Sequence, residues 1–372
     1  MSGRKVVILL HQPGLGGATS SVLGTVPLLE RDGWRFAFWV PGDGAARSEL
    51  VARGYEVGGE PRPLRYSRRA LSEPPGAFPR LVRTPGYLRR VRQWVAVQSP
   101  DLVHSNTLVT LPELVASRRG RRPALMHVHE MVASDIRGRA AAVLLRGAAT
   151  DVVACSTPCA EALRRHGVRC SVVHEGVAPP AVTRGARRAD PVVVGTAGTI
   201  SARKGSDLFV EAAAGLMGAL PHSEFRLAGE LAPGPDEAWA KRTVERAERS
   251  GIRYVGHVDM ATELSKLDVF VLPSRQDPFP LTVLEAMAAG VPVVGTRVDG
   301  IAEQLAGDAG LLVDSEDPAE LASAIERLAR DADLRAELGE AGRRRVVENF
   351  TVQHQAEGLR RSYEQALAAR PA

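Results

Sequence analysis

Two segments of the sequence combine charged residues in a way that could hold a phosphorylated ligand. Arg203 and Lys204 stand directly before Gly205 in "TISARKGSD". Asp277 and Glu285 bracket the start of an apolar helical pattern in "SRQDPFPLTVLEAMAAG". Free backbone N–H groups at a helix start attract anions, and fixed cations nearby strengthen that attraction. We therefore treat both segments as candidate parts of one diphosphate site.

Each segment also has a purely structural explanation. Thr282 and Glu285 fit a T-x-x-E capping box, in which the glutamate only satisfies the backbone of its own helix. A surface Arg-Lys pair such as Arg203 and Lys204 usually contacts only solvent. Both segments, however, fall at predicted strand–loop–helix junctions, where α/β folds collect ligands. This shared position favours the binding interpretation.

The elements around these segments predict an α/β fold. Both "RKVVILLHQPGLGGATSS" and "DPVVVGTAGTISARKGSD" read as a buried strand, a loop and a helix start. Short β-branched runs that alternate with helical patterns are typical of parallel sheets built from βαβ units. The predicted strands are Val6–Leu10, Arg35–Val40, Leu102–His104, Ala124–His129, Val152–Cys155, Ser171–His174, Val192–Thr196, Glu224–Ala228, Arg253–Val255, Val269–Leu272, Pro292–Gly295 and Gly310–Val313.

These strands fall into two groups, so we expect two doubly wound, Rossmann-like domains that face each other across a cleft. The boundaries are 1–176 for the first domain and 191–352 for the second, followed by a helical segment, 353–372. Residues 177–190 are rich in Pro, Gly, Arg and Ala and lack an apolar period, which indicates a linker. A length of 372 residues also suits two domains.

Composition limits the class of protein. A hydrophobic content of 44% with 24% charged residues is that of an ordinary globular protein. The net charge of +5 suits phosphorylated ligands or an anionic surface without requiring nucleic acid. Cys155, Cys159 and Cys170 are odd in number and lack CxxC pairs, so neither a disulfide framework nor a metal site is indicated. The apolar run "VVILL" is too short for a signal peptide or a membrane span. We expect a cytoplasmic enzyme.

The N-terminal half offers further candidates. In "HQPGLGGATSS", Thr19 replaces the third glycine of G-x-G-x-x-G, which argues against a nicotinamide site. Gly16 and Gly17 could let backbone amides approach a diphosphate or a sugar, and a tight βα turn is the alternative explanation. His129 with Glu130 ends a predicted strand, where ligand groups gather. A lone histidine is more often structural, and we expect His127 to face the other side of the sheet.

The segment "SRQDPFPLTVLEAMAAGVPVV", followed by "VDGIAE", resembles the nucleotide-sugar signature of the retaining glycosyltransferases of family 4, which have the GT-B fold. Similar segments run along almost the whole chain: "GLGGA", "PDLVHSNT", "HVHE", "VVACS", "VVHEGV", "TISARKGSD", "FRLAGE" and "IRYVGHV". The resemblance implies transfer of a sugar from a nucleotide-sugar donor with retention at the anomeric carbon. It also implies an N-terminal acceptor domain, a C-terminal donor domain, and a final helix that crosses back to the first domain.

The resemblance assigns roles to individual residues. Glu285 would accept hydrogen bonds from the donor ribose, and Asp277 would contact the hydroxyls of the donor sugar. Lys204, helped by Arg203, would neutralise the leaving diphosphate. His129 would meet the donor sugar near the reacting carbon, and no side chain is assigned as a nucleophile. The remaining donor-site residues are His257 and Val258 at the base, and Phe279, Pro280, Leu281 and Thr282, whose backbone would face phosphate or sugar.

Two positions depart from the family pattern. The first signature acid is usually Glu, whereas this chain has the shorter Asp277, and Thr199 stands after Gly198 where Arg is frequent. No cofactor and no metal are expected. The "DAD" at Asp331–Asp333 resembles a metal-binding DxD motif, but it precedes a clear helical pattern, so we predict that it caps this helix.

The segment Arg62–Arg92 contains nine arginines and a single acid, Glu73. A solvated surface, an acceptor site for a phosphorylated or acidic substrate, and peripheral contact with an anionic membrane at its inner face are all compatible with it. Nucleic-acid binding is not expected, because aromatic platforms are absent.

The donor base and the acceptor also stay open. Uridine diphosphate sugars are the first choice on frequency, and the acceptor could be a glycan, a lipid-linked molecule or a natural product. Two alternatives to a transferase are a nucleotide-sugar epimerase of the same fold and a non-catalytic nucleotide-sugar-binding subunit.

Overall fold

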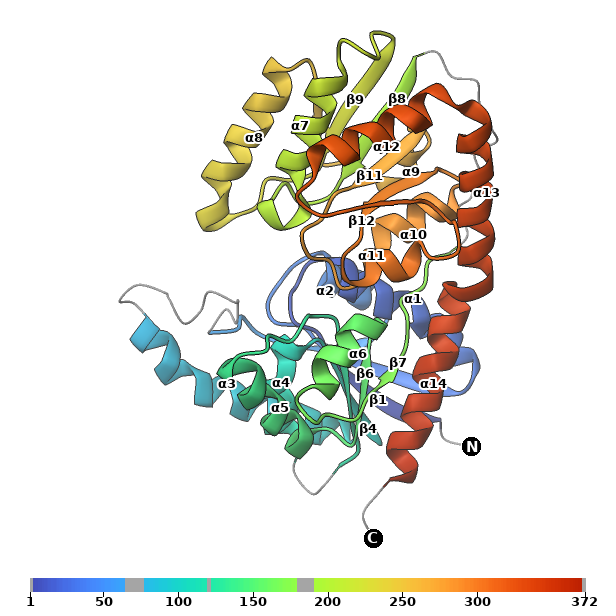
Figure 1. Cartoon of the computed structure of the whole chain (residues 1–372). Coiled ribbons are helices and arrows are strands. Elements are labelled where there is room, and N and C mark those ends of the chain that lie inside the picture. The colour runs from blue at the N-terminus through green and yellow to red at the C-terminus, as the bar shows by residue number, and fades with distance from the viewer. Residues whose placement is uncertain (1–2, 64–76, 119–121, 179–190, 370–372) are drawn as a thin grey trace. The chain divides into compact units, whose positions relative to one another are not determined.

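The computed structural model describes residues 3–63, 77–118, 122–178 and 191–369, with the side chains of 77–83 left aside. It divides into two compact units, each a parallel sheet flanked by helices (Figure 1). Unit 1 comprises Met1–His174 and Val352–Ala372, and unit 2 comprises Glu175–Thr351. The fully parallel sheets follow from strands that are apolar on both faces and therefore need cover on both sides.

Unit 1 has a seven-stranded sheet in the order β3-β2-β1-β4-β5-β6-β7. Its strands are β1 (Arg4–Leu9), β2 (Trp34–Trp39), β3 (Glu56–Gly58), β4 (Leu102–Asn106), β5 (Ala124–Val128), β6 (Asp151–Ala154) and β7 (Ser171–Val172). Its helices are α1 (Gly17–Arg31), α2 (Ala45–Ala52), α3 (Ala77–Gln98), the 3-10 turn η1 (Leu108–Thr110), α4 (Leu111–Ser117), α5 (Ile136–Ala148), α6 (Thr157–Arg164) and α14 (Val352–Ala368). The strand order reverses between β1 and β4.

The last helix of the chain, α14, packs on α1 within unit 1. Tyr363 of α14 is fully buried and meets Trp34 edge to face at a ring-centroid distance of 5.2 Å. The Nε2 of Gln355 donates to the Oγ of Ser21 at 2.7 Å. Apolar burial and a satisfied buried polar pair thus fix the C-terminal helix on the N-terminal sheet.

Unit 2 has a six-stranded sheet in the order β10-β9-β8-β11-β12-β13. Its strands are β8 (Val192–Ala197), β9 (Ser223–Ala228), β10 (Arg253–Gly256), β11 (Val269–Leu272), β12 (Val293–Thr296) and β13 (Leu311–Val313). Its helices are η2 (Ala202–Lys204), α7 (Ser206–Leu216), η3 (Gly234–Asp236), α8 (Glu237–Arg249), α9 (Met260–Leu264), α10 (Leu281–Ala288), α11 (Asp299–Gln304), α12 (Pro318–Arg330) and α13 (Ala332–Asn349). Here the order reverses between β8 and β11.

All twelve predicted strands are present, with ends that differ by one or two residues. The sequence analysis missed β3, a three-residue strand at the edge of the sheet, which is too short to show a period. The predicted capping role of Asp331 is confirmed, because its Oδ1 accepts the backbone N–H of Leu334 at 2.9 Å in the first turn of α13.

Candidate active site

The most highly charged cluster proposed from the sequence lies at the switch point of unit 2. Strands β8 and β11 are neighbours there, and the loops that follow them leave the same edge of the sheet. Lys204 closes the first loop and Asp277 lies in the second. The Nζ of Lys204 is 2.6 Å from the Oδ2 of Asp277, and both side chains are largely buried. The structure therefore brings together two residues that are 73 positions apart in the sequence.

Gly205 lets the Lys204 loop approach the β11 loop. Its φ is +69°, and a Cβ at this position would stand 1.8 Å from the carbonyl oxygen of Pro273. Any other residue would therefore push the two loops apart. The Oγ of Ser201 accepts the backbone N–H of Lys204 at 3.4 Å and supports the turn from the other side.

Arg275 fixes the same two loops through its guanidinium. Its Nη1 and Nη2 donate to the two carboxylate oxygens of Asp207, at 2.7 and 2.9 Å. The Nε and Nη2 donate to Glu316, and Nη1 also donates to the carbonyl of Ala202 at 2.7 Å. All five N–H donors of the guanidinium are thus used. The two carboxylates raise the pKa of Arg275 above its usual range, chiefly through these hydrogen bonds.

The backbone around Asp277 is held by the loop after β12. The backbone N–H of Asp277 donates to the Oδ2 of Asp299 at 3.0 Å, and its carbonyl accepts from the N–H of Gly300 at 3.2 Å. The buried Oγ of Ser274 donates to Oδ2 of Asp277 at 3.4 Å. The sequence analysis missed Asp299, Ser274 and Arg275 as supports of the site, although the first lies in the "VDGIAE" segment.

Glu285 does not form a capping box. Helix α10 begins at Leu281 after Pro280, which occupies the N-cap position without a side-chain cap. Thr282 is therefore already inside the first turn, and its buried Oγ1 has no hydrogen-bond partner. The carboxylate of Glu285 has neither a hydrogen bond nor an ion pair among the described residues. The structural alternative for Glu285 is wrong, and its carboxylate is available for a ligand.

Burial raises the pKa of Glu285, and the nearby charge of Asp259 raises it further. Asp259 caps α9 and follows His257 and Val258, which come directly after β10. The residues expected at the base and the residue expected at the ribose are therefore neighbours. His257 itself is exposed, with its Nδ1 3.2 Å from the Oε1 of Glu230.

The positions of the other donor-site candidates are less specific evidence for a role in binding. Arg203 is exposed, and its Nη1 donates to the carbonyl of Gln276 at 2.8 Å, which turns it onto the β11 loop. The ring of Phe279 is buried against Phe350, with centroids 5.5 Å apart. Its side chain thus belongs to the core, and only its backbone could face a ligand.

In unit 1, His129 lies just past β5 and beside the end of β4. Its Nε2 is 3.2 Å from the Oδ1 of Asn106, the last residue of β4. The Oε2 of Glu130 accepts the backbone N–H groups of His129 and Leu108, at 3.1 and 3.0 Å. Glu130 therefore ties together the loops after two adjacent strands and positions the histidine.

The expectation that His127 faces away from His129 is wrong. Their ring centroids are 4.0 Å apart, because residues two apart in a strand share a face. His104 of β4 continues the row, 5.7 Å from His127, and its Nδ1 is 2.7 Å from the hydroxyl of Tyr363. Burial lowers the pKa of His104 to about 3 and that of His127 well below its usual range, and neighbouring histidines lower both further.

The loop after β1 contributes Gly16 and His11. A Cβ on Gly16 would lie 2.1 Å from the Nε2 of Gln12, so the end of the Gln12 side chain packs directly on this glycine, while Gly17 begins α1 and is exposed. The Nδ1 of His11 is buried without a hydrogen-bond partner. Burial lowers the pKa of His11 to about 4, and His129 and Arg62 lower it further.

The basic segment Arg62–Arg92 is only partly described. The side chains of Arg65, Arg68, Arg69, Arg80 and Arg83 lie outside the described residues. Arg62 is not solvated: it is buried in an ion pair with Glu113 at 2.6 Å, next to the hydroxyl of Tyr87. Arg89 and Arg92 are exposed, and Arg90 is paired with Glu60.

Comparison with known proteins agrees with this description of both units. The model of the family described as "Glycosyltransferase Family 4" matches residues 15–179, and that described as "Glycosyl transferases group 1" matches residues 191–331. The lipopolysaccharide core biosynthesis mannosyltransferase LpsB of Rhizobium meliloti is 33% identical over 47% of this chain and 52% of its own length. A D-inositol 3-phosphate glycosyltransferase of Pseudarthrobacter chlorophenolicus is 35% identical over 53% of this chain and 51% of its own length. The matches span about half the length of these curated relatives.

Solved structures show the same fold over the whole chain. Anabaena Alr3699/HepE, solved with UDP and glucose, gives a TM-score of 0.81 at 20% identity and covers 97% of this chain and 99% of its own. A sucrose-phosphate synthase of Thermosynechococcus elongatus gives 0.79 at 21% identity, covering 98% and 100%. The expected GT-B fold, with two Rossmann-like domains, is confirmed. With both halves matched, the chain belongs to glycosyltransferase family 4.

Proposed function

We propose that this protein transfers a sugar from a nucleotide diphosphate sugar to a hydroxyl group of an acceptor, with retention of the anomeric configuration and without a metal ion. The observation that carries the proposal is the Lys204–Asp277 pair at the switch point of unit 2. The unpaired carboxylate of Glu285, on the helix that follows the same loop, supports it. A cation and two carboxylates in this arrangement suit a ligand with both phosphates and hydroxyls.

In the proposed reaction the bond between the anomeric carbon and the diphosphate oxygen breaks while the acceptor oxygen bonds to the same face of the sugar. The acceptor proton passes to the leaving phosphate oxygen. Lys204 has three N–H donors, of which Asp277 takes one, so two can face the charge that develops on the diphosphate. No protein nucleophile is required.

The remaining donor contacts follow from the same loops. Glu285 would accept hydrogen bonds from the ribose, and the loop of His257 and Val258 would hold the base. Asp277 would contact the sugar hydroxyls, and the unpaired first-turn amides of α10 would meet phosphate or sugar. We take a UDP-sugar as the first candidate, which the UDP and glucose bound by the Anabaena protein support.

We assign the acceptor to unit 1, with His129 closest to the reacting carbon. The rings of His11, whose pKa is lowered by burial, and of His129 would receive hydroxyl groups, next to the buried Arg62–Glu113 pair. The Arg62–Arg92 segment stays a candidate for either an acidic acceptor or an anionic membrane. We place the reaction in the cytoplasm, because Cys155, Cys159 and Cys170 are all free thiols.

Calorimetric titration with UDP, GDP, ADP and TDP, each with and without EDTA, tests the donor site. We expect one nucleotide to bind selectively, with an affinity unchanged by EDTA and lost in Lys204→Ala. Lys241→Ala, at an exposed lysine of α8 paired with Glu237, is the matched control and should bind as the wild type does. Absence of binding to all four nucleotides would favour a non-catalytic subunit.

The stereochemical proposal has its own test. The slow hydrolysis of an α-linked UDP-sugar, followed by proton NMR, shows which anomer appears first. Retention predicts that the α anomer forms before mutarotation, whereas the β anomer would contradict it. Interconversion of the UDP-sugar to a different UDP-sugar would instead identify an epimerase.

A further inference from the structure

Three sulfur atoms lie next to one another in unit 1, beside the loop that contains His129. The Sγ of Cys159, in the first turn of α6, is 3.8 Å from the Sγ of Cys155, which comes directly after β6. It is also 3.4 Å from the Sδ of Met131, in the loop after β5. Both thiols are buried, and the methionine is half-buried. We call Met131, Cys155 and Cys159 the sulfur cluster.

The topology of the sheet brings the sulfur cluster together. Strands β5 and β6 are parallel neighbours, so the loops after them leave the same edge of the sheet. The Oγ of Ser156 caps α6 and accepts the backbone N–H of Cys159 at 3.4 Å. The Sγ of Cys159 is then 3.6 Å from the carbonyl oxygen of Glu130, in the β5 loop. The sequence analysis indicated no metal site from the cysteines, because the third sulfur, on Met131, is 28 positions away from Cys159.

The spacing of the sulfur cluster suits a three-coordinate metal ion. A trigonal centre with metal–sulfur bonds of about 2.3 Å places its sulfur atoms about 4 Å apart. The two separations at Cys159, 3.8 and 3.4 Å, are already near this value. A methionine side chain has three rotatable bonds, so Met131 can complete the triangle by a small change of conformation. Thiolates and thioethers are soft ligands of the kind that bind Cu(I), whereas a structural zinc site takes four Cys or His ligands.

We propose that the sulfur cluster binds one Cu(I) ion. Cys155 and Cys159 bind it as thiolates, each releasing its proton to solvent, and Met131 binds it through a lone pair of Sδ. The oxidation state of the metal and of the sulfurs does not change. The centre keeps one negative charge, and it lies at the N-terminus of α6, where the helix dipole favours an anion. The half-buried Met131 gives the ion a path from solvent to the buried thiols.

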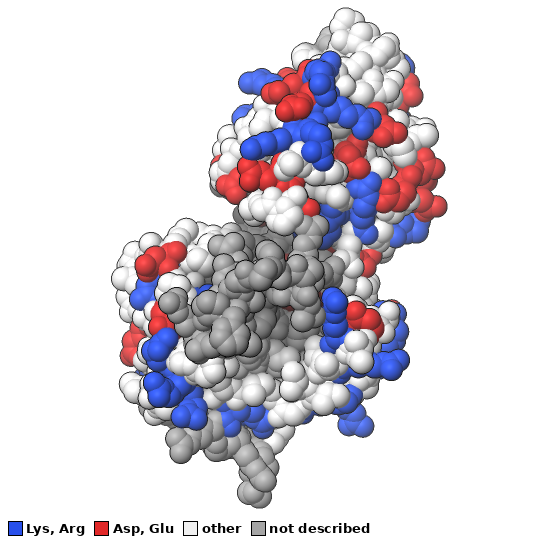
Figure 2. All heavy atoms as spheres, turned by 90° about the vertical axis from the view of Figure 1, so that its left-hand side faces the viewer, with Lys and Arg blue, Asp and Glu red and all other residues white. Residues whose placement is uncertain are grey.

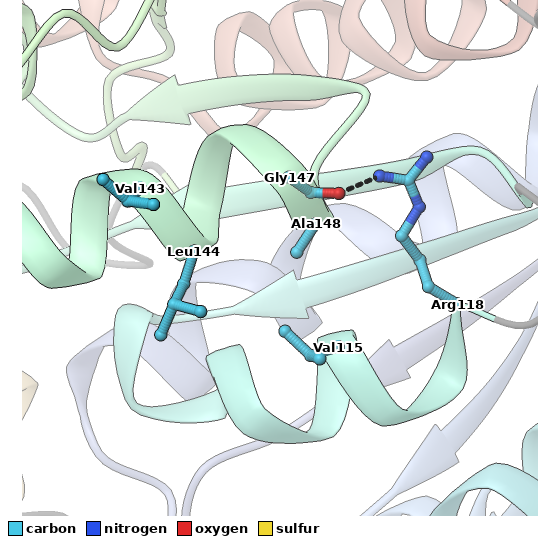
Figure 3. Close-up of a pocket in the computed structure, with 6 residues that line it drawn as sticks. All are labelled: Val115, Arg118, Val143, Leu144, Gly147 and Ala148. Carbon is cyan, nitrogen blue, oxygen red and sulfur yellow. Dashed lines mark hydrogen bonds between the residues drawn. The ribbon is translucent and has the colours of Figure 1, made fainter.

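Other parts of the described chain are not suited to this ion. No three His, Cys, Asp or Glu side chains of the described residues are grouped to hold a metal. On the face shown in Figure 2, Asp and Glu lie next to Lys and Arg, and oxygen ligands suit hard cations instead. A hollow of about 550 Å³ between α4 and α5 is lined by Val115, Arg118, Val143, Leu144, Gly147 and Ala148. Its one charged side chain, Arg118, donates to the carbonyl of Gly147 at 2.6 Å, so this lining has no side chain that binds a metal (Figure 3).

A disulfide between the two thiols is the alternative use of the sulfur cluster. Its formation needs an oxidant and would shorten the distance between the Sγ atoms of Cys155 and Cys159 from 3.8 Å to about 2.05 Å. A thioether takes no part in a disulfide, yet Met131 lies closer to the Sγ of Cys159 than Cys155 does. This third sulfur favours a metal ion. The proposed copper site lies in unit 1, the proposed sugar transfer does not use its ion, and neither proposal depends on the other.

Competition with the Cu(I) chelator bicinchoninate, under anaerobic and reducing conditions, tests the proposal on the full-length protein. We expect the wild type to withdraw one equivalent of Cu(I) from the chelator. Cys159→Ser should bind the ion at least about 100-fold more weakly, because a hydroxyl group is a poor ligand for a soft ion. Met131→Leu conserves the volume of the side chain and should bind it about tenfold more weakly, since it removes one of three ligands.

Cys170→Ser and Met260→Leu are the matched controls. The Sγ of Cys170 donates to the carbonyl of Ala160, and Met260 begins α9 in unit 2. Both variants should bind Cu(I) as the wild type does, and circular dichroism should show all variants folded. X-ray absorption of the loaded wild type should show three sulfur ligands at about 2.3 Å.

Three results would overturn the proposal. The first is a wild type that leaves all Cu(I) with the chelator, and the second is a Cys159→Ser variant that binds the ion as tightly as the wild type. The third is unchanged affinity in Met131→Leu, which would exclude the thioether as a ligand. A wild type that takes up no Cu(I) but forms a disulfide between Cys155 and Cys159 with oxidised glutathione would overturn it in favour of a redox pair.

Discussion

The two units share one sheet topology but present different chemistry at their switch points. In unit 2, the loops after β8 and β11 hold the Lys204–Asp277 ion pair, which Arg275 supports through Asp207 and Glu316. In unit 1, the corresponding strands β1 and β4, with β5 beside them, end near His11, Asn106 and His129. Burial keeps His11, His104 and His127 neutral at physiological pH by lowering the pKa of each.

This difference shows what the topology does and does not decide. Parallel strands bring the loops after β1 and β4, or after β8 and β11, to the same place. The residues in those loops then select the ligand: fixed charges suit a diphosphate, and neutral rings suit hydroxyl groups. Unit 1 also holds the buried hydroxyls of Thr19 and Thr107, which have no hydrogen-bond partner among the described residues. Both hydroxyls are therefore available to a polar ligand.

We expect the largest effect from removing the positive charge of Lys204 in unit 2. Lys204→Ala removes the charge that would face the leaving diphosphate in the proposed reaction, so we expect turnover to fall by about 10² to 10³-fold. Steady-state kinetics measure this fall, and the melting temperature should also decrease because the largely buried Asp277 loses its ion-pair partner, so turnover is measured well below that temperature. Lys241→Ala is the control on an exposed lysine. Equal turnover in Lys204→Ala and Lys241→Ala would contradict the proposal that the charged switch point of unit 2 differs in function from that of unit 1.

We expect the second-largest effect from Glu285→Gln. The donor KM or Kd should rise by about 10- to 100-fold, since a hydrogen bond to a charged group contributes about 1.5 to 3 kcal/mol. Burial raises the pKa of Glu285, so its ionised form is disfavoured by folding, and the variant should be as stable as the wild type at neutral pH or slightly more stable. For the same reason, the donor affinity of the wild type should fall as the pH decreases, and this fall should begin at a higher pH than for a glutamate with an ordinary pKa. Glu285→Gln should lose this pH dependence.

A variant that only lowers the melting temperature, with unchanged kinetics, would show that Glu285 has a structural role. Calorimetric unfolding at neutral pH, compared with donor titration of the same sample, separates the two outcomes.

Arg275→Lys tests whether the Lys204–Asp277 pair depends on the hydrogen bonds that Arg275 makes. Lysine keeps the positive charge but cannot bridge Asp207, Glu316 and the carbonyl of Ala202 together. We expect a loss of about tenfold in kcat with a smaller change in KM, and a destabilisation of about 1 to 2 kcal/mol because the cluster is partly exposed. Chemical denaturation gives the second number. Unchanged kcat in a destabilised variant would limit Arg275 to a purely structural role.

The smallest effect concerns the histidine row of unit 1. The native pKa of His104 is about 3 and the usual value is 6.5, so the unfolded chain binds more protons between these limits. Stability is therefore complete above pH 6.5 and is lost as the pH falls toward 3, by about 3 kcal/mol for one such ring at pH 4.5. In unit 2, both histidines, His222 and His257, are exposed.

Tryptophan fluorescence can follow this unfolding, because Trp34, Trp39 and Trp94 lie in unit 1 and only Trp239 lies in unit 2. The midpoint of thermal unfolding should fall with pH in the wild type and fall less in His127→Gln. Parallel pH profiles for the two proteins would contradict the assignment of neutral, buried rings.

Local patterns in the sequence predicted most of the fold and part of the site. Short apolar, β-branched runs located twelve strands, and the position of Lys204 and Asp277 after two of them placed both residues in one candidate site. Asp331 was placed correctly because a cap depends only on the next three residues. The capping box that Thr282 and Glu285 could have formed is absent, because Pro280 is the N-cap and the helix begins two residues earlier than this box requires.

Contacts between residues far apart in the sequence could not be predicted from such local patterns. Arg275 binds Asp207 and Glu316, which are 68 and 41 positions away, and a single sequence gives no sign of these pairs. The row of His104, His127 and Tyr363 likewise depends on α14 returning to unit 1.

The most direct test of the contrast between the units is hydrogen exchange of the full-length protein, followed by mass spectrometry, with and without saturating UDP. We predict slower exchange in the two loops of unit 2, residues 198–205 and 273–285, and unchanged exchange in residues 11–19 of unit 1. Protection confined to residues 11–19, with residues 198–205 and 273–285 exchanging as in the free protein, would contradict the assignment of the nucleotide to unit 2.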